Sequence, residues 1–191
     1  MRVLVAPTPT IIAAAYDEEG KADACTLAFY SPISHEPPCV VIGINASLKR
    51  RTLKSILSSG AFTIGLPSIN QVEAVDYLGV ETGYNTDKLR NVGFTTSEGQ
   101  AVHAPVIDQM KLTLECEVIH TVTIGSHTQI TGEIKNMQAV AEILNEKGRV
   151  DLNALDPVIY DEEGFNYHKL GQPVADAYKM GAALKKSLDQ K

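Results

Sequence analysis

The clearest pattern in the chain is an alternation of apolar and polar residues in the segment from Lys111 to Ile119. Its apolar positions are Leu112, Leu114, Cys116 and Val118, and its polar positions are Lys111, Thr113, Glu115 and Glu117. A period of two is typical of a strand with one buried face. The segment 128–134 repeats the alternation, so the sequence predicts two half-buried strands here.

Shorter apolar runs predict further strands at residues 11–16, 24–30, 39–44, 61–66 and 158–160. A charged, turn-forming segment separates the first two runs. Pro32, Pro37 and Pro38 follow the second run, and they predict a loop that includes residues 30–34.

Four segments have the features of helices. Thr52 is the expected N-cap of the first, and Gly60 is expected to end it. Asn70 with Glu73 predicts a capping box for the second, which stops near Gly79. A short helix is expected around 139–145, and a C-terminal helix is indicated by the spacing of Val174, Ala177, Tyr178, Gly181, Leu184 and Leu188. Many strands with few helices favour a mainly-β fold, a β-barrel with flanking helices, and we assign residues 1–191 to one domain.

Composition and charge narrow the functional classes. The chain has a net charge of −6, a pI of about 5.3 and no Trp, which argues against a nucleic-acid partner. No apolar run approaches the ~20 residues that span a membrane, and no signal peptide is visible. Cys25, Cys39 and Cys116 are few and distant, so we expect free thiols and a cytoplasmic location.

Several common motifs do not occur in the sequence. It has no GxGxxG and no GxxxxGK[ST], the fingerprints of dinucleotide and P-loop sites. It also has no HExxH and no paired cysteines, so no metal site is predicted. The three cysteines are interpreted as small buried apolar residues.

A basic run stands at the start of the first predicted helix. Lys49, Arg50 and Arg51 precede Thr52, and cations at a helix N-terminus oppose the helix dipole. A bound phosphate would resolve this conflict, because it would meet free backbone N–H groups, the Thr52 hydroxyl and a guanidinium fork. The alternative is a solvated basic turn, which the local pattern alone favours slightly.

Two further segments offer groups to a ligand. Residues 30–34 carry three hydroxyls on the predicted loop, and hydroxyls suit phosphate or ring-edge hydrogen bonds. In the segment 125–133, Gly132 would permit close approach of a ligand to the backbone. The plain alternatives are a Ser/Pro turn and a hairpin arm with His127 exposed.

Four segments, taken in order, resemble the flavin reductase-like family with the FMN-binding split barrel, especially its flavoredoxin branch. They are CTLAFYSPISHEPPCVVIGIN with the following RRT and SGAFTIGLPS, then GYNTDKLRNVGF, LECEVIHTVTIGSHTQITGEI and NYHKLGQPVADAYKMG. The resemblance covers roughly residues 8–181. It implies a flavoprotein oxidoreductase with FMN as cofactor, and a homodimer, since family members are usually homodimers.

The resemblance also implies the residues of the site. The loop after the second strand and the Arg/Thr segment would hold the phosphate and the ring edge, and Tyr167, contributed by either subunit, would lie close to the flavin. His127 belongs to a Gly-Asp-His motif that the family links to the reduced nicotinamide, and it is the implied catalytic residue. The implied FMN-binding residues are Thr26, Tyr30, Ser31, Pro32, Ile33, Ser34, Asn45, Arg50, Arg51, Thr52, Lys88 and Tyr167.

Three functions follow from these observations. An NAD(P)H-dependent flavin reductase is supported by Gly125 and His127. An FMN electron carrier that serves redox protein partners is favoured by Ser126, which stands where the family motif has Asp. Ala28 also departs from the Asn of many flavin reductases. A third function, a barrel without flavin used only for interaction, conflicts with the Arg50–Thr52 helix start.

Overall fold

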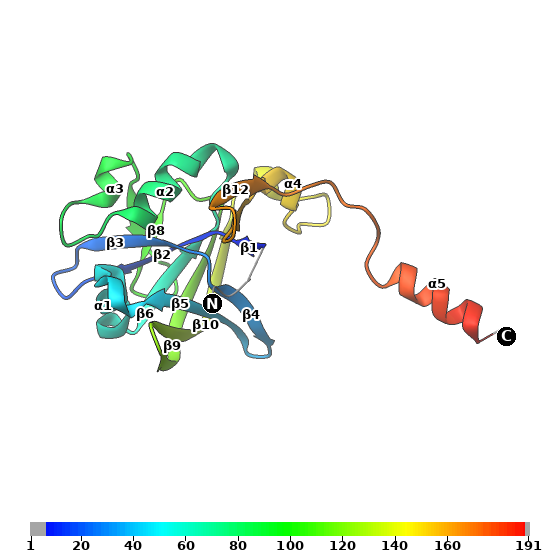
Figure 1. Cartoon of the computed structure of the whole chain (residues 1–191), viewed down its shortest axis with the longest axis horizontal. Helices are drawn as coiled ribbons and strands as arrows, with labels where there is room; N and C mark the ends of the chain where they lie inside the picture. Colours follow the sequence, from blue (N-terminus) through cyan, green and yellow to red (C-terminus); the bar gives the residue numbers. More distant parts are fainter. Residues whose placement is uncertain (1–6, 190–191) are drawn as a thin grey trace.

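The main body of the protein is a seven-stranded antiparallel sheet (Figure 1). The structure, a computed structural model, describes residues 7–189. In spatial order the strands are β3 (Ala22–Leu27), β2 (Ile11–Tyr16), β6 (Ala61–Gly65), β9 (Leu112–Ile124), β10 (His127–Ala139), β5 (Pro38–Asn45) and β4 (Tyr30–His35). The expected mainly-β fold with flanking helices is confirmed.

Two small sheets accompany the main one. The first joins β1 (Thr8–Pro9), β11 (Val158–Asp161) and β12 (Asn166–Lys169). It therefore pairs a strand from the beginning of the described chain with two strands that come after residue 157. The second joins β7 (Thr96–Glu98) to β8 (Pro105–Ile107).

Helices cover both faces of the β2–β3 region. On the inner face, Leu53 and Ile56 of α1 (Arg51–Ser59) pack in the core that Ile11, Ile42 and Phe62 help to form. On the outer face, Val75 and Leu78 of α2 (Val72–Val80) and Leu89 of α3 (Lys88–Asn91) pack against Ile12, Ala14 and Ala24. The remaining short helical elements are η1 (Ala46–Leu48), η2 (Ile69–Gln71), η3 (Ala141–Ile143) and α4 (Leu152–Leu155).

The expected caps of the first two helices need correction. Arg50, not Thr52, is the N-cap of α1, because the Thr52 hydroxyl donates to the buried carboxylate of Asp23 instead (2.6 Å). Gly60 ends α1 as expected, with a φ of 70°. The box ahead of α2 is formed by Ser68 and Gln71 rather than by Asn70 and Glu73.

The expected strands are present, with different limits. The loop predicted at residues 30–34 is wrong: these residues form most of β4, an edge strand that tolerates Pro32 because one side is unpaired. β9 and β10 extend beyond the alternating segments and form one long hairpin, closed at Gly125 with a φ of 58°. The residues of strand β12 are mostly exposed, so no apolar pattern in the sequence predicts this strand.

Gly132 serves the core rather than a ligand. A Cβ at this position would lie 2.6 Å from the Phe62 ring and 3.0 Å from the Cys116 Cβ. A larger residue at this position would therefore displace the Phe62 ring from the core. The suggested approach of a ligand to this backbone is not what the structure shows.

The C-terminal segment stands apart from the body. The helix α5 (Lys179–Leu188) begins five residues later than the expected Val174, after a residue, Tyr178, with a φ of 68°. Residues 170–178 form no helix or strand and are exposed, and they carry α5 away from the sheets (Figure 1). The helix expected at 139–145 is reduced to η3.

Glu115 on β9 is fully buried and anchors the loop 99–104. Its Oε2 accepts from the backbone N–H groups of Ala101 (2.7 Å) and Val102 (3.3 Å). Its Oε1 accepts from the side-chain amides of Asn136 and Gln138, each at 2.7 Å. Burial alone raises the pKa of this carboxyl, but these four hydrogen bonds to the ionised form outweigh it, and the pKa lies below its ordinary value.

Candidate functional site

A first hollow of about 490 Å³ opens where β4, β5 and the end of the β9–β10 hairpin meet. Its walls are mostly apolar, and they include Phe29, Gly43 and Ile124. A Cβ at Gly43 would lie 3.0 Å from the Phe29 Cβ, so glycine leaves room for that ring. Polar groups come from Tyr30, Ser31, Gln129 and His127 at the rim. A largely apolar hollow with a few polar groups is the usual form of a cofactor site.

His127 is held in place from two sides. Its ring lies 4.9 Å from the Phe29 ring, centroid to centroid, at an angle of 42°. Its Nδ1 lies 2.9 Å from the Ser126 hydroxyl, and its backbone pairs with Asn45 across β10 and β5. The Ala46 N–H donates to the Ser126 carbonyl (2.8 Å), which ties the hairpin turn to η1.

A second hollow of about 310 Å³ adjoins the first, and Ala28 lines both. Thr26, Gly79, Tyr160 and Tyr167 are among its other lining residues. The Tyr167 hydroxyl donates to Asp76 Oδ1 (2.9 Å), and its ring lies 5.6 Å from that of Tyr160. Burial and the Asp76 carboxylate raise the pKa of Tyr167, so this phenol stays protonated and remains a donor.

Arg50 connects the start of α1 to the second hollow. Its guanidinium donates to the carbonyls of Gly79 and Glu81, the latter at 2.7 Å, at the C-terminal end of α2. A cation at a helix C-terminus is favourable. The Arg50 side chain, although it stands at the N-terminus of α1, therefore stabilises the C-terminal end of α2. Because Gly79 also lines the second hollow, the Arg50 guanidinium lies at the edge of the face that the two hollows form.

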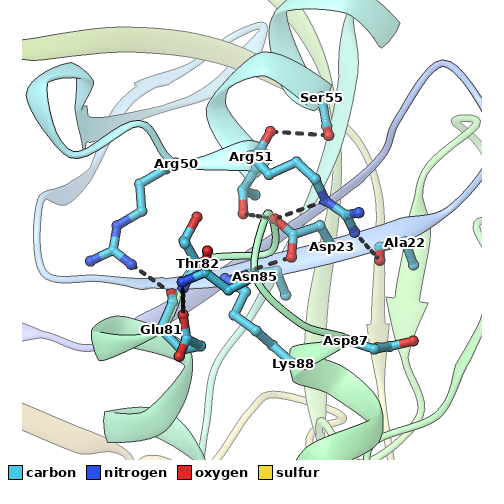
Figure 2. A network of polar contacts seen from close by, with 12 residues as sticks. Ala22, Asp23, Arg50, Arg51, Ser55, Glu81, Thr82, Asn85, Asp87 and Lys88 are labelled. Carbon is cyan, nitrogen blue, oxygen red and sulfur yellow. Dashed lines mark hydrogen bonds and ion pairs between the residues drawn. The ribbon is translucent and has the colours of Figure 1, made fainter.

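Behind this face lies a buried network of charges centred on Asp23 (Figure 2). The Lys88 ammonium lies 3.6 Å from Asp23 Oδ1 and also donates to the Ala24 carbonyl. The Arg51 Nε lies 3.8 Å from Asp23 Oδ2, and its Nη2 donates to the Ala22 carbonyl (3.1 Å). Together with the Thr52 hydroxyl, these groups fix α1 and α3 to β3.

Comparison with known proteins identifies the family. The family model described as "Flavin reductase like domain" matches residues 3–168. The chain belongs to this family. A flavoredoxin of Desulfovibrio vulgaris (Miyazaki F) is 31% identical, with a TM-score of 0.89 over 95% of this chain and 96% of that one. A flavoredoxin from Methanosarcina acetivorans is 27% identical, also with a TM-score of 0.89, over 96% and 95%. The fold is therefore the split barrel of flavin reductase-like proteins, as the resemblance implied.

Two relatives of similar sequence are named only as uncharacterized proteins. An uncharacterized protein of Aeropyrum pernix is 26% identical over 83% of this chain, which spans 59% of that protein. One of Archaeoglobus fulgidus is 30% identical over 60% of this chain, which spans 63% of that protein. The chain thus spans about three fifths of the length of these two relatives.

The structure brings most of the residues implied by the family to this face. Thr26, Tyr30, Ser31, Tyr167 and His127 line the two hollows. Asn45 and Arg50 lie beside them, with the Asn45 side chain accepting from the Ser47 N–H (2.9 Å). Ser31, Pro32 and Ile33 on β4 are exposed, and Ser34 is half-buried.

Three implied residues lie behind the face rather than on it. Arg51, Thr52 and Lys88 all direct their polar atoms to Asp23 and its neighbours. The positive charges at the start of α1 are thus paired with carboxylates and carbonyls of the protein itself, rather than with a bound phosphate. Their direct contact with a phosphate stays a prediction.

Sequence reasoning missed Phe29, Ile124, Asp76 and Asp23. The first two become wall residues only through the pairing of distant strands, and no local signal marks them. Asp23 had a weak signal: it is a carboxylate between Ala22 and Ala24, directly before an apolar run, and a buried carboxylate needs a partner.

Residues 7–189 offer neither a metal site nor a membrane-spanning helix. No group of three or more His, Cys, Asp or Glu side chains there could hold a metal ion. No helix in the same span is long and apolar enough to cross a membrane. Cys25, Cys39 and Cys116 are free and buried, and burial raises the pKa of Cys116 to about 12.

Proposed function

We propose that the chain binds FMN on the face formed by the two hollows and passes electrons through it. The observation that carries this proposal is the pair of adjoining hollows that share Ala28, with His127 in the wall of the first and the Arg50 guanidinium bound to Gly79 at the edge of the second. A flat aromatic ring suits the apolar end, and a phosphate suits the basic end. One phosphate group fits the absence of a Gly-rich pyrophosphate loop in the sequence.

The residues present fit such a cofactor in size and chemistry. The hollows together exceed the lower range of ligand sites, about 300 Å³. Gln129, Ser31 and Tyr30 offer hydrogen bonds to a ring edge, while the Arg50 guanidinium supplies positive charge at the edge of the second hollow. Bound flavin supplies the electron-transfer chemistry itself, so the protein's part is to position the ring and to exclude water.

Two modes of action remain as proposals within this function. In the first, NAD(P)H donates electrons, and His127 orients the nicotinamide at the first hollow. In the second, a redox protein partner exchanges electrons with the chain, as in an electron carrier. The second is supported by Ser126, whose neutral hydroxyl faces His127 Nδ1 where the family motif carries a carboxylate. We also propose a homodimer located in the cytoplasm.

Filling the point shared by the two hollows should abolish tight FMN binding. Ala28→Phe places a ring between them, and we expect the dissociation constant for FMN to rise at least tenfold. FMN released by heat from the parent and identified by chromatography gives the reference, and titration of the apoprotein gives both affinities. The matched control is Ala74→Phe, because Ala74 lines a separate hollow on α2. Recovery of FAD from the parent, or equal effects of both variants, would contradict the proposal.

Changing the His127 motif should alter the rate of reduction without altering FMN affinity. If NAD(P)H is the donor, His127→Ala slows flavin reduction, because the imidazole orients the nicotinamide. If the chain is an electron carrier, the parent is already slow, and Ser126→Asp raises the rate. Anaerobic stopped-flow absorbance measures each case, with the exposed His120→Ala as a control on the neighbouring strand. Identical rates in all four proteins would remove the motif from the mechanism.

A further inference from the structure

The second hollow differs from the first in the chemistry of its walls. Its lining includes four hydroxyl side chains, those of Thr10, Thr26, Tyr160 and Tyr167, together with the carboxylate of Asp76. Among the residues that the structure describes, no Lys, Arg or His lines this hollow. The charge in its lining is therefore negative, and its walls are rich in groups that form hydrogen bonds.

Asp76 is the charged residue of this lining, and one of its oxygens is open to a ligand. The residue lies on α2 and is exposed. The Tyr167 hydroxyl donates to Oδ1 at 2.9 Å, whereas within residues 7–189 no group donates to Oδ2. An ionised carboxylate accepts hydrogen bonds and donates none, so a ligand group that meets Oδ2 has to bring the proton.

Thr10 adds a second polar group without a partner. The residue is only 3% exposed, and its Oγ1 forms no hydrogen bond within the described chain. Its backbone is satisfied, because its N–H donates to the Val158 carbonyl (3.0 Å). A buried hydroxyl without a partner costs free energy, so its place in the wall of a hollow indicates a ligand that supplies the partner.

These walls discriminate among the parts of the proposed cofactor. A phosphate inside the second hollow would face the Asp76 carboxylate with no cation in the described lining, and like charges repel. A flat ring is better suited to the first hollow, whose walls are mostly apolar. The ring and the phosphate of FMN are joined by a chain of hydroxyl groups, which donate and accept hydrogen bonds. This polyol chain suits the hydroxyls and the carboxylate of the second hollow.

The position of the second hollow agrees with this assignment. It adjoins the first hollow at Ala28, and the Arg50 guanidinium is bound to Gly79 at its edge. The group that joins the ring to the phosphate therefore has to pass through the second hollow if the two ends of FMN lie as proposed.

We propose that the second hollow binds the polyol chain of the flavin, with Asp76 Oδ2 as the main acceptor of its hydroxyl protons and the Thr10 hydroxyl as a further partner. This inference rests on the proposed binding of FMN. It names the part of the site that selects a flavin with a polyol chain over the bare ring. Neither residue transfers electrons, so the selection is measured as affinity.

Three flavins that differ only in their side chain test the assignment. FMN carries the polyol chain and the phosphate, riboflavin carries the chain alone, and lumiflavin has a methyl group instead. Asp76→Asn keeps an oxygen for the Tyr167 hydroxyl but replaces Oδ2 with an NH2 donor. We expect the dissociation constant of the apoprotein for riboflavin to rise about tenfold, as for the loss of a hydrogen bond to a charged group. The constant for lumiflavin should not change, and quenching of flavin fluorescence measures both.

The pattern across the three flavins separates the possible occupants of the hollow. If the phosphate lay there, Asp76→Asn would tighten FMN binding and leave riboflavin unchanged. If the ring lay there, all three dissociation constants would change together. Either result overturns the inference, and so does an unchanged set of constants. A parent that binds none of the three flavins overturns the proposed function itself. The matched control is Glu73→Gln, three residues earlier on α2, because Glu73 lines a separate hollow.

Thr10→Val provides a second measurement, one that a merely structural role would not reproduce. Valine has nearly the shape of threonine, and the Thr10 hydroxyl has no partner in the described chain. The urea midpoint of the apoprotein should therefore not fall, whereas the dissociation constant for riboflavin should rise about threefold and that for lumiflavin should stay the same. A lower midpoint, with riboflavin and lumiflavin weakened alike, would overturn the assignment of Thr10 to the polyol chain.

Discussion

Asp23→Ala should destabilise the protein by about 3–5 kcal/mol, the range for breaking a buried ion pair from one side. Asp23 is buried and lies 3.6 Å from the Lys88 ammonium and 3.8 Å from the Arg51 Nε. Removing the carboxylate leaves the buried Lys88 without a counter-charge and the Thr52 hydroxyl without an acceptor. Urea unfolding followed by circular dichroism measures the loss as a lower midpoint at constant slope.

The control for this variant is Glu18→Ala. Glu18 pairs with Lys54 at 3.6 Å, but both side chains are largely exposed. Water and salt screen such a pair, so we expect a change within about 1 kcal/mol. If Asp23→Ala were as mild as Glu18→Ala, the network would be peripheral to the fold. FMN affinity of the folded fraction tests separately whether the network also supports the cofactor face.

Glu115→Gln should destabilise the protein by about 2–3 kcal/mol despite its nearly equal volume, because the new amide group opposes buried donors. The Ala101 N–H and the amides of Asn136 and Gln138 all donate to this carboxylate at 2.7 Å. Chemical denaturation at neutral pH measures the difference. The matched control is Glu117→Gln, two residues along the strand, whose exposed carboxylate pairs with Lys135 (3.0 Å).

The difference in stability between the parent and Glu115→Gln should depend on pH. The folded-state pKa of Glu115 lies below its ordinary value of 4.5. The ionised form therefore stabilises the fold fully above about pH 4.5, and this contribution is lost as the pH falls through the lowered pKa. The stability gap between the parent and Glu115→Gln should be constant at neutral pH and should shrink under acid. A gap that widens under acid would contradict this assignment.

Strands with an apolar pattern were predictable from sequence, but the extent of their burial was not. The alternation predicts one buried face for β9, whereas Thr113 and Glu115 on its other face are buried as well. The alternation around Leu114 and Cys116 marked β9, and the run at Val40 and Ile42 marked β5, because burial leaves a repeating apolar trace. β4 and β12 leave no such trace, since most of their residues are exposed. Propensity alone then favours a loop wherever proline and hydroxyl residues gather, as at Pro32.

For the candidate site, the resemblance indicated several residues that line the two hollows, but not the contacts between them. The family resemblance indicated Tyr30, Tyr167 and His127, which line the two hollows. It could not indicate that Thr52 turns to Asp23, because 29 residues separate them in sequence. Arg50 likewise finds its carbonyl partners about 30 positions away. Long-range pairs of this kind decide which polar groups remain available to a ligand.

The two outer strands of the main sheet are each made unsuitable for adding another strand. On β4, Pro32 lacks an N–H, and the register shifts between Pro32 and Ser34. On β3, the Arg51 and Lys88 side chains occupy the carbonyls of Ala22 and Ala24, which an incoming chain would need. Blocked edges of this kind guard against edge-to-edge aggregation. The cations that hold β3 to the helices therefore also keep separate molecules from joining their sheets.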